Sequence, residues 1–142
     1  MSCQVREVSG TEYAETIQRF NSMAPEIFPP LKPHHLRDGF WWLIFQMDHA
    51  RAFAGLVPMI PFPGVGYLKR CWVHPQYRGR GWQKILLEER EMKACALGWK
   101  MLVSECHETN HPSANNFLRC GYVETFPEQP WAPNSRFWVK KI

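Results

Sequence analysis

The alternation of apolar and polar residues along the chain predicts short strands separated by a few helices. Short apolar runs, several with a two-residue period, predict strands, whereas apolar residues three or four positions apart predict amphipathic helices. The predicted strands cover residues 4–9, 41–47, 51–59, 67–73, 100–105, 122–126 and 136–140, with a turn at 48–50. The predicted helices cover residues 12–21, 34–38, 82–97 and 113–119, and Thr11 is the expected N-cap of the first.

This order of elements predicts an α/β (α+β) fold, in which a mixed sheet carries helices on both faces. The length of 142 residues and the 45% apolar content predict one globular domain over residues 1–142. The helix at 82–97 is expected to bury one broad face, made of Trp82, Ile85, Leu86, Met92 and Ala96. Arg90 is expected on the remaining, solvent-facing side with the acidic residues of this helix.

Residues 66–87 combine a strand, a basic glycine-rich turn and a helix start. Pro75 ends the strand because it has no N–H for a ladder, the turn reads Arg78-Gly79-Arg80-Gly81, and the helical pattern begins at Trp82. N–H groups at the positive end of a helix, beside glycines that admit a ligand to the backbone, form an anion cradle. The spacing fits neither the Walker loop nor the GxGxxG fingerprint, and a turn that only caps a surface helix is the alternative.

Two motifs resemble the signatures of the GNAT superfamily of N-acetyltransferases. The first, a strand ending V-x-P and then Q/R-x-x-G-x-G/A, is matched by Val73, Pro75, Arg78 and Gly81. Gln83 departs from it, since the family usually has Gly or Ala there. The second, N-x-x-A/S-x-x-x-Y-x-K-x-G-F, is matched by Asn110, Ser113, Arg119, Gly121 and Tyr122. The motifs occur in the family's order, and the resemblance covers residues 50–126.

The resemblance implies a fold, a cofactor and a set of site residues. It implies a mostly antiparallel central sheet of about six to seven strands, with the fourth and fifth strands splayed to admit acetyl-CoA. The residues that it implies for cofactor binding are Cys71, Trp72, Val73, Arg78, Gly79, Arg80, Gly81, Trp82, Gln83, Asn110, Ser113 and Phe117. The acceptor-pocket candidates from the proline-punctuated segment at 22–40 are Phe28, Leu31, His34, His35 and Phe40.

The general base does not follow the family's usual pattern. Many members carry a carboxylate on the fourth strand, where this chain has Tyr67, Lys69 and Cys71. A lysine-like amine with a pKa near ~10.4 is mostly protonated at neutral pH, so a base assists its attack on a thioester. Glu105 and His107, at the end of the fifth predicted strand, are the nearest candidates, with solvated loop residues as the alternative.

The proton donor for the departing thiolate differs as well. The family often has a tyrosine seven residues after the motif asparagine, and this chain has Phe117 there. Phenylalanine cannot donate a proton, so Tyr122, Cys120 or water would replace it, or the thiolate would leave unassisted.

Charge and cysteine usage narrow the function classes. The net charge of +4 is concentrated around the predicted cradle, in Lys69, Arg70, Arg78, Arg80 and Lys84. A polyanionic cofactor accounts for this charge, so a nucleic-acid partner is not required. Five scattered cysteines without a C-x-x-C pair predict reduced thiols, no metal site and a cytoplasmic location. No apolar run approaches the roughly 20 residues needed to cross a bilayer.

Together these features predict an acetyl-CoA-dependent N-acetyltransferase that acts on a primary amine of a small molecule, peptide or protein. A non-catalytic acyl-CoA-binding module is the first alternative, because Phe117 replaces the expected proton donor and the fourth-strand carboxylate is missing. A nucleic-acid-associated protein is the second. Trp131, before the last predicted strand, is expected to pack over the acceptor pocket, into a homodimer contact or against its own strand.

Overall fold

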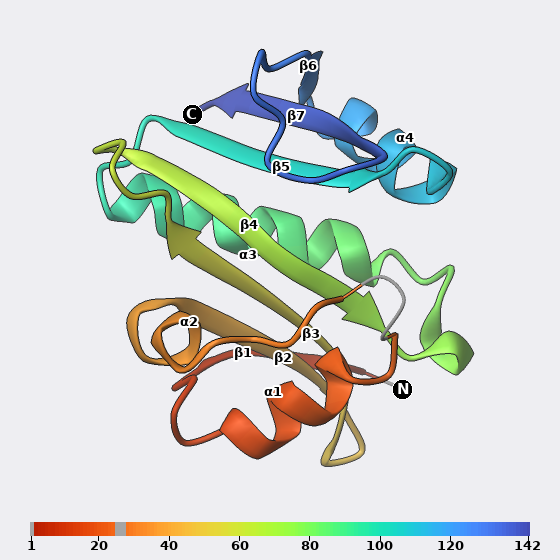
Figure 1. Ribbon diagram of the computed structural model, residues 1–142. Coiled ribbons are helices and arrows are strands. Elements are labelled where there is room, and N and C mark those ends of the chain that lie inside the picture. Colours follow the sequence, from red (N-terminus) through yellow and green to blue (C-terminus); the bar gives the residue numbers. More distant parts are fainter. Residues whose placement is uncertain (1, 25–27) are drawn as a thin grey trace. The chain divides into compact units, whose positions relative to one another are not determined.

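A computed structural model describes residues 2–24 and 28–142. Within these ranges it contains seven strands, four α-helices and one 3₁₀ helix (Figure 1). In chain order they are β1 (Gln4–Val8), α1 (Ala14–Asn21), α2 (Pro33–Asp38), β2 (Phe40–Gln46), β3 (His49–Pro58), β4 (Val65–Val73), η1 (Pro75–Tyr77), α3 (Trp82–Ala96), β5 (Met101–His107), α4 (His111–Arg119), β6 (Val123–Thr125) and β7 (Ser135–Lys141). Every helix and strand predicted from the sequence is present.

The strands form one sheet with the order β1-β2-β3-β4-β5-β7-β6. The pairs β1–β2, β2–β3, β5–β7 and β6–β7 are antiparallel, and β4 pairs with β5 in parallel. The parallel ladder joins Val65–Tyr67 to Met101–Val103, so it involves the first part of each strand. The mixed, mostly antiparallel sheet that was predicted is therefore confirmed, and the short parallel ladder agrees with the splayed strands that the resemblance implies.

The chain divides into two compact units, which are described separately. The first contains Met1–Val57 and Leu68–Arg90, and the second contains Pro58–Tyr67 and Glu91–Ile142. The first unit therefore holds the cradle and the acceptor-pocket candidates, whereas the second holds β5, α4, β6 and β7.

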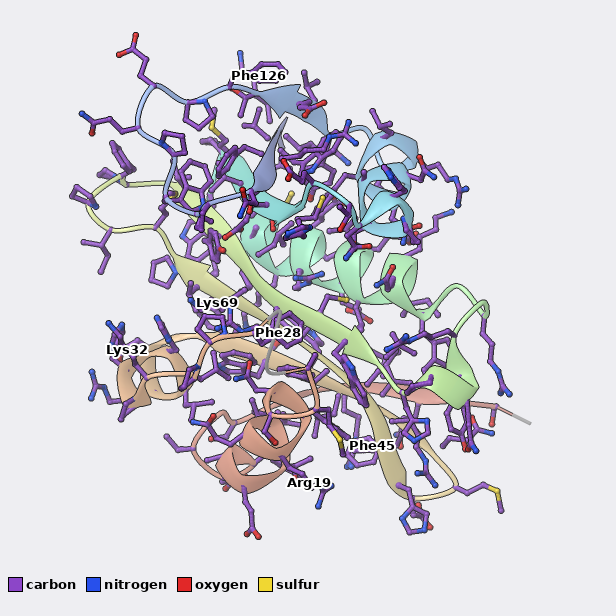
Figure 2. All side chains as sticks on the ribbon, turned by 45° about the vertical axis from the view of Figure 1, so that its right-hand side comes forward. Arg19, Phe28, Lys32, Phe45, Lys69 and Phe126 are labelled. Carbon is purple, nitrogen blue, oxygen red and sulfur yellow. The ribbon has the colours of Figure 1, made fainter. Side chains whose placement is uncertain are left out.

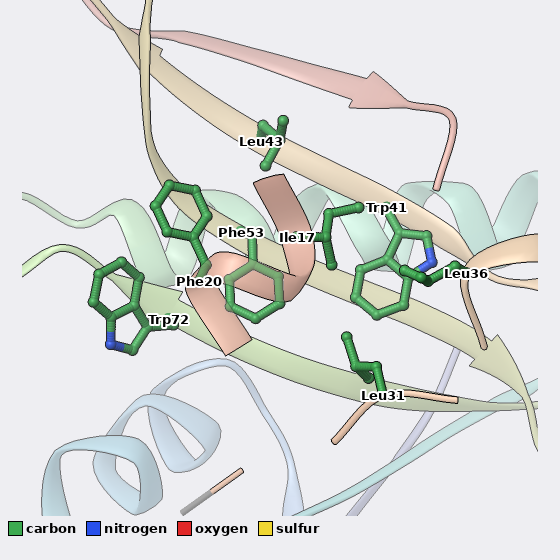
Figure 3. Packing of buried hydrophobic residues seen from close by; sticks show 8 residues of the cluster. All are labelled: Ile17, Phe20, Leu31, Leu36, Trp41, Leu43, Phe53 and Trp72. Carbon is green, nitrogen blue, oxygen red and sulfur yellow. The ribbon is translucent and has the colours of Figure 1, made fainter. Parts of the chain in front are cut away.

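The core of the first unit lies between α1, α2 and one face of β2–β4 (Figures 1 and 3). Its buried side chains are Ile17, Phe20, Leu31, Leu36, Trp41, Leu43, Phe53 and Trp72. The Phe20 and Trp72 rings lie with centroids 5.3 Å apart, and Trp41 stacks on Phe53 at 6.3 Å. This packing fixes the end of β4, because Trp72 lies one residue before its last residue.

The first turns of α3 pack on the other face of β3 and β4. Trp82, Leu86, Arg90 and Ala94 are all buried and follow one another at four-residue spacing, so they form a single stripe along the helix. The sequence prediction was wrong for three positions: Arg90 is 3% exposed, Met92 is 60% exposed, and Ala96 is exposed as well. Arg90 donates from Nη1 to the carbonyls of Gly55, at 3.2 Å, and Arg70, at 3.1 Å. These bonds satisfy the buried guanidinium and join α3 to β3 and β4.

The core of the second unit is built on β5 and β7. Leu102, Ser104 and Cys106 alternate into it from β5, and Trp138 of β7 is completely buried. The Trp138 indole N–H donates to Cys106 Sγ at 3.3 Å, and Phe117 of α4 stacks on the indole with centroids 5.5 Å apart. The aromatic pair holds α4 against the sheet.

Three local predictions need correction. The expected N-cap of α1, Thr11, does not cap it, because a turn closed by the Tyr13 N–H on the Ser9 carbonyl delays the helix to Ala14. The hairpin turn lies at Met47–Asp48, with φ of 51° and 65°, instead of 48–50. β5 extends to His107, so Glu105 lies inside the strand.

Trp131 packs beside its following strand, with its ring centroid 4.5 Å from that of Phe137, and remains 41% exposed. This matches the simplest of the three arrangements expected for it. Among the described residues, no helix combines the length and apolar character needed to span a membrane.

Candidate functional site

The predicted anion cradle lies between the end of β4 and the start of α3. The His74 N–H continues the sheet by donating to the Arg51 carbonyl at 2.8 Å, and His74 Nδ1 then accepts from the Gln76 N–H at 3.2 Å to start η1. Arg78 folds back and donates from Nε to the Val73 carbonyl at 2.9 Å. One guanidinium donor of Arg78 therefore closes the loop on its own strand.

Two glycines in left-handed conformations carry the chain from this loop into α3. Gly79 has φ 79° and Gly81 has φ 81°, which other residues adopt only with strain. A Cβ added at either position would meet no described atom within 4 Å, so the space beside both glycines is open. Glycine is therefore required here by the positive φ and not by a lack of space. The first α-helical bond runs from Ile85 N–H to Gly81 C=O at 3.1 Å. The N–H groups before it lie at the positive end of the helix dipole.

Aromatic and basic side chains form the rim of the cradle. Tyr77 stacks on Trp82 with centroids 5.2 Å apart, and the Arg80 and Arg51 guanidinium carbons lie 4.8 and 5.4 Å from the Tyr77 ring centre. Arg51 Nε is buried without a hydrogen-bond partner among the described residues. A buried, unsatisfied donor of this kind is costly, and a bound anion would satisfy it. The cradle therefore fits the pyrophosphate of coenzyme A in backbone conformation, open space and charge.

Arg51 was not predicted as a cofactor-binding residue, because no motif next to it in the sequence indicates such a role. It lies near the start of β3, and its approach to the Tyr77 ring depends on the position of β3 beside β4 and on the η1 turn. Among the other predicted cofactor ligands, Cys71 is half-buried, and desolvation raises the pKa of its thiol in spite of Arg90. The thiol is thus protonated at neutral pH and a poor nucleophile.

The acceptor-pocket candidates have different surroundings. Phe28 is half-buried, edge-on to Phe53 at 6.3 Å, whereas Leu31 is 5% exposed and belongs to the hydrophobic core. His34 is exposed and His35 half-buried, with ring centroids 4.3 Å apart.

Phe40 lines a cavity of about 310 Å³ between the β1–α1 turn and α2, together with Leu36 and Gly10. No residue of the cradle lines this cavity.

Arg70 holds the segment before α2 in place. It has φ 63° inside β4, and its Nε donates to Asn21 Oδ1 at 2.8 Å while Nη2 donates to the Pro29 carbonyl at 2.9 Å. Asn21 Nδ2 also donates to Pro29, at 3.0 Å, and Gln18 Nε2 donates to the Leu31 carbonyl at 3.2 Å. The described part of this loop is therefore fixed by side chains of α1 and β4.

His35 lies among positive charges. Burial, and then the charges of Lys69, His34, Arg70 and Lys32, lower its pKa from 6.5 to about 4. Its Nδ1 accepts the Lys32 N–H at 3.1 Å, which requires the unprotonated nitrogen. His35 is thus neutral at pH 7.

In the second unit, the structure brings Glu105 together with Tyr67. The Tyr67 hydroxyl donates to the Glu105 carboxylate across the β4–β5 pair, and both side chains are half-buried. His107 lies at the exposed end of β5, where Nδ1 contacts Thr109 Oγ1 at 2.7 Å. Of the two predicted bases, Glu105 therefore has the more protected and better oriented side chain.

The remaining predicted site residues have structural contacts. Asn110 caps α4, accepting the Ser113 N–H on Oδ1 at 3.3 Å. Tyr122 is 3% exposed and its hydroxyl donates to Glu91 at 2.9 Å. Phe117 packs between Tyr122 and Trp138. Within the described ranges, no group of three or more His, Cys, Asp or Glu side chains is placed to hold a metal ion.

The sheet, the glycine turn and the helix start define an acetyltransferase of the coenzyme A-dependent class. The sequence model of the acetyltransferase (GNAT) family matches residues 9–122, and the chain belongs to this family. Its acyl donor is accordingly acetyl-CoA, as the resemblance implied, and amines are the acceptors of the family.

Solved structures agree on the fold. The chain is similar to an N-acetyltransferase from Staphylococcus aureus Mu50, with a TM-score of 0.80, 14% identity and 99% of each chain covered. It is also similar to the PaiA N-acetyltransferase from Thermoplasma acidophilum in complex with coenzyme A, with a TM-score of 0.76, 16% identity and 100% of each chain covered. The comparison with curated proteins gave no match.

Proposed function

We propose that residues 1–142 form one acetyltransferase domain that moves an acetyl group directly from acetyl-CoA to a primary amine of a small molecule, peptide or protein. The observation that carries the proposal is the cradle, where two left-handed glycines leave open space beside a helix start. Protonation of the Cys71 thiol favours direct transfer over a cysteine-bound intermediate. The scattered cysteines, which include no C-x-x-C pair, support a cytoplasmic location, and a homodimer stays a prediction.

The test is incubation of the protein with acetyl-CoA and a panel of amines. Acetylated amine and an equal amount of free thiol are expected products. Tight binding of acetyl-CoA without transfer to any amine would favour the binding-module alternative. Binding of a short duplex with steep salt dependence would favour the nucleic-acid alternative.

When bound, acetyl-CoA supplies an activated acetyl group as a thioester. We assign its phosphates to the backbone around Gly79 and Gly81 and to the guanidinium groups of Arg80 and Arg51. Glu105 is proposed as the base that removes the amine proton, and Tyr67 as the residue that orients its carboxylate. Water is proposed as the proton donor, because Phe117 cannot donate and the Tyr122 hydroxyl already donates to Glu91.

Gly81→Asp is expected to weaken acetyl-CoA binding at least tenfold, because it adds a Cβ and a carboxylate to the cradle. The increase in Tm that saturating acetyl-CoA produces should shrink accordingly. Gly98→Asp is the matched control, since Gly98 has φ 79°, equal open space and a position after the other end of α3. If both variants bind acetyl-CoA like the wild type, the assignment of the cradle is wrong.

Arg51→Gln is expected to raise the Kd for coenzyme A roughly tenfold, because one charge-assisted hydrogen bond is lost. Calorimetric titration measures this without any acetyl transfer. Arg37→Gln is the control, since Arg37 is exposed and pairs with the adjacent Asp38. An unchanged Kd in Arg51→Gln would show that its buried Nε does not serve the cofactor.

A further inference from the structure

Glu105 and Phe137 lie side by side on one face of the sheet in the second unit. They are directly opposite each other in the antiparallel β5–β7 ladder, so their side chains point to the same face with Cβ atoms roughly 5 Å apart. Val103 and Val139 form the preceding pair on this face, and Tyr67 of β4 pairs with Val103. The Glu105 carboxylate therefore has aromatic and aliphatic neighbours on its own face of the sheet.

The connection between β6 and β7 adds Trp131 to the same face. Its ring lies against that of Phe137, with centroids 4.5 Å apart and planes at 67°. In Figure 1 this connection crosses in front of β7. Helix α4 packs on the other face, because its Phe117 stacks on Trp138, which follows Phe137 in the strand and points the opposite way. Trp131 and Glu105 thus share a face that α4 does not cover.

Trp131 is held in place although its ring is partly open to solvent. The connection, residues 126–134, includes three prolines, which restrict its backbone. Its end is tied to the end of β5 by the Glu108 N–H, which donates to the Asn134 carbonyl at 2.9 Å. Phe137 is 6% exposed, whereas Trp131 is 41% exposed. A ligand on this face would meet an aromatic surface that is already oriented, and this lowers the entropic cost of binding.

The neighbours of Glu105 indicate which acceptors fit. In the proposed function Glu105 removes the amine proton, so the amine nitrogen lies within hydrogen-bond reach of its carboxylate. The carbon group that bears this nitrogen then lies over the neighbouring side chains, and on the β7 side these are Phe137 and Trp131. Burial of aromatic carbon against the two rings is favourable, whereas a polar group would lose its water without gaining a hydrogen bond from the ring faces.

We propose that Trp131 and Phe137 form an acceptor subsite beside Glu105, and that the preferred acceptor is a primary amine joined to an aromatic ring by a short alkyl chain. The inference rests on the proposed acetylation of amines and specifies the class of acceptor. Trp131 is then a specificity-determining residue. In the reaction the amine nitrogen loses its proton and forms the new amide bond, the C–S bond of the thioester breaks, coenzyme A leaves as the thiol, and the aromatic ring stays unchanged.

The test compares amines with and without the ring. Benzylamine, 2-phenylethylamine and 3-phenylpropylamine are paired with methylamine, ethylamine and propylamine, and rates are expressed per unprotonated amine because the phenyl group lowers the pKa of the nitrogen. Binding is measured separately, by calorimetric titration in the presence of coenzyme A, so that it is seen even without transfer. In at least one pair the ring-bearing amine is expected to have a kcat/KM about tenfold or more above that of its partner, mainly through a lower KM.

Variants locate the effect. Trp131→Ala should move the ratio of ring-bearing to ringless kcat/KM toward one, chiefly by raising the KM of the ring-bearing amine, with an unchanged Kd for acetyl-CoA. Trp131→Phe should restore part of the ratio, because it returns an aromatic surface. Phe126→Ala is the matched control and should keep the ratio, since Phe126 belongs to the same connection (Figure 2) and is 82% exposed.

The remaining outcomes also discriminate. Equal use of both amines in every pair, with acetylation intact, would overturn the acceptor class and leave the proposed function standing. Binding of 2-phenylethylamine that depends on Trp131, without acetylation of any amine, would support the subsite and contradict the proposed function. A ring preference that Trp131→Ala leaves unchanged would overturn the assignment to this face. If Trp131→Ala changes the sedimentation coefficient and keeps the ratio, Trp131 belongs to a contact between two copies of the chain and the inference is wrong.

Discussion

Glu105→Gln is expected to lower kcat about 100-fold or more, because an amide cannot accept the proton of the attacking amine. The half-buried carboxylate accepts a hydrogen bond from Tyr67, which fixes its orientation. Binding of acetyl-CoA should be unchanged, since the cradle contains none of these atoms. The rise of kcat/KM with pH that a base produces should also disappear in the variant.

Two further variants test this assignment. Tyr67→Phe removes only the hydroxyl that orients Glu105, so it should lower kcat by roughly tenfold and retain the pH-dependent limb. Glu124→Gln is the control for the change of charge, because Glu124 pairs with Arg136 at 2.8 Å on β6 and β7. If Glu105→Gln kept the wild-type rates and pH profile, the proton of the attacking amine would be removed by another group or by bulk water. The same test applied to His107→Ala addresses the second predicted base.

The helices and strands could be predicted because their periodicity is local. Phe20 and Ile17 mark the buried face of α1, and the alternation of Leu102, Ser104 and Cys106 marks β5. The cradle could also be predicted, because a proline, two glycines and a helix start are contiguous in sequence and impose their conformation directly. In each case the cause lies within a few residues of its effect.

The parts that escaped prediction depend on contacts between distant segments. Tyr67 and Glu105 meet because the parallel ladder places β4 beside β5, and nothing near either residue marks the pairing. The left-handed conformation of Arg70 has no glycine or asparagine to mark it. For Arg90 a signal did exist: it follows Leu86 by four residues, on the stripe that Trp82 begins. It was overridden by the expectation that arginine faces solvent, which fails when backbone carbonyls satisfy the guanidinium.

Arg90→Met is expected to lower the free energy of unfolding by about 2–4 kcal/mol. The methionine fills part of the same volume but leaves the carbonyls of Gly55 and Arg70 without their buried charged donor, and each such bond contributes roughly 1.5–3 kcal/mol. The avoided burial of a charge offsets part of this loss. Denaturant unfolding at constant m measures the change.

Lys84→Met, on the exposed side of the same helix, is the control and should change stability by no more than about 0.5 kcal/mol, because its pair with Glu88 is exposed and 3.8 Å long. Unchanged stability of Arg90→Met would mean that the hydrogen bonds of Arg90 contribute no more than the cost of burying its charge.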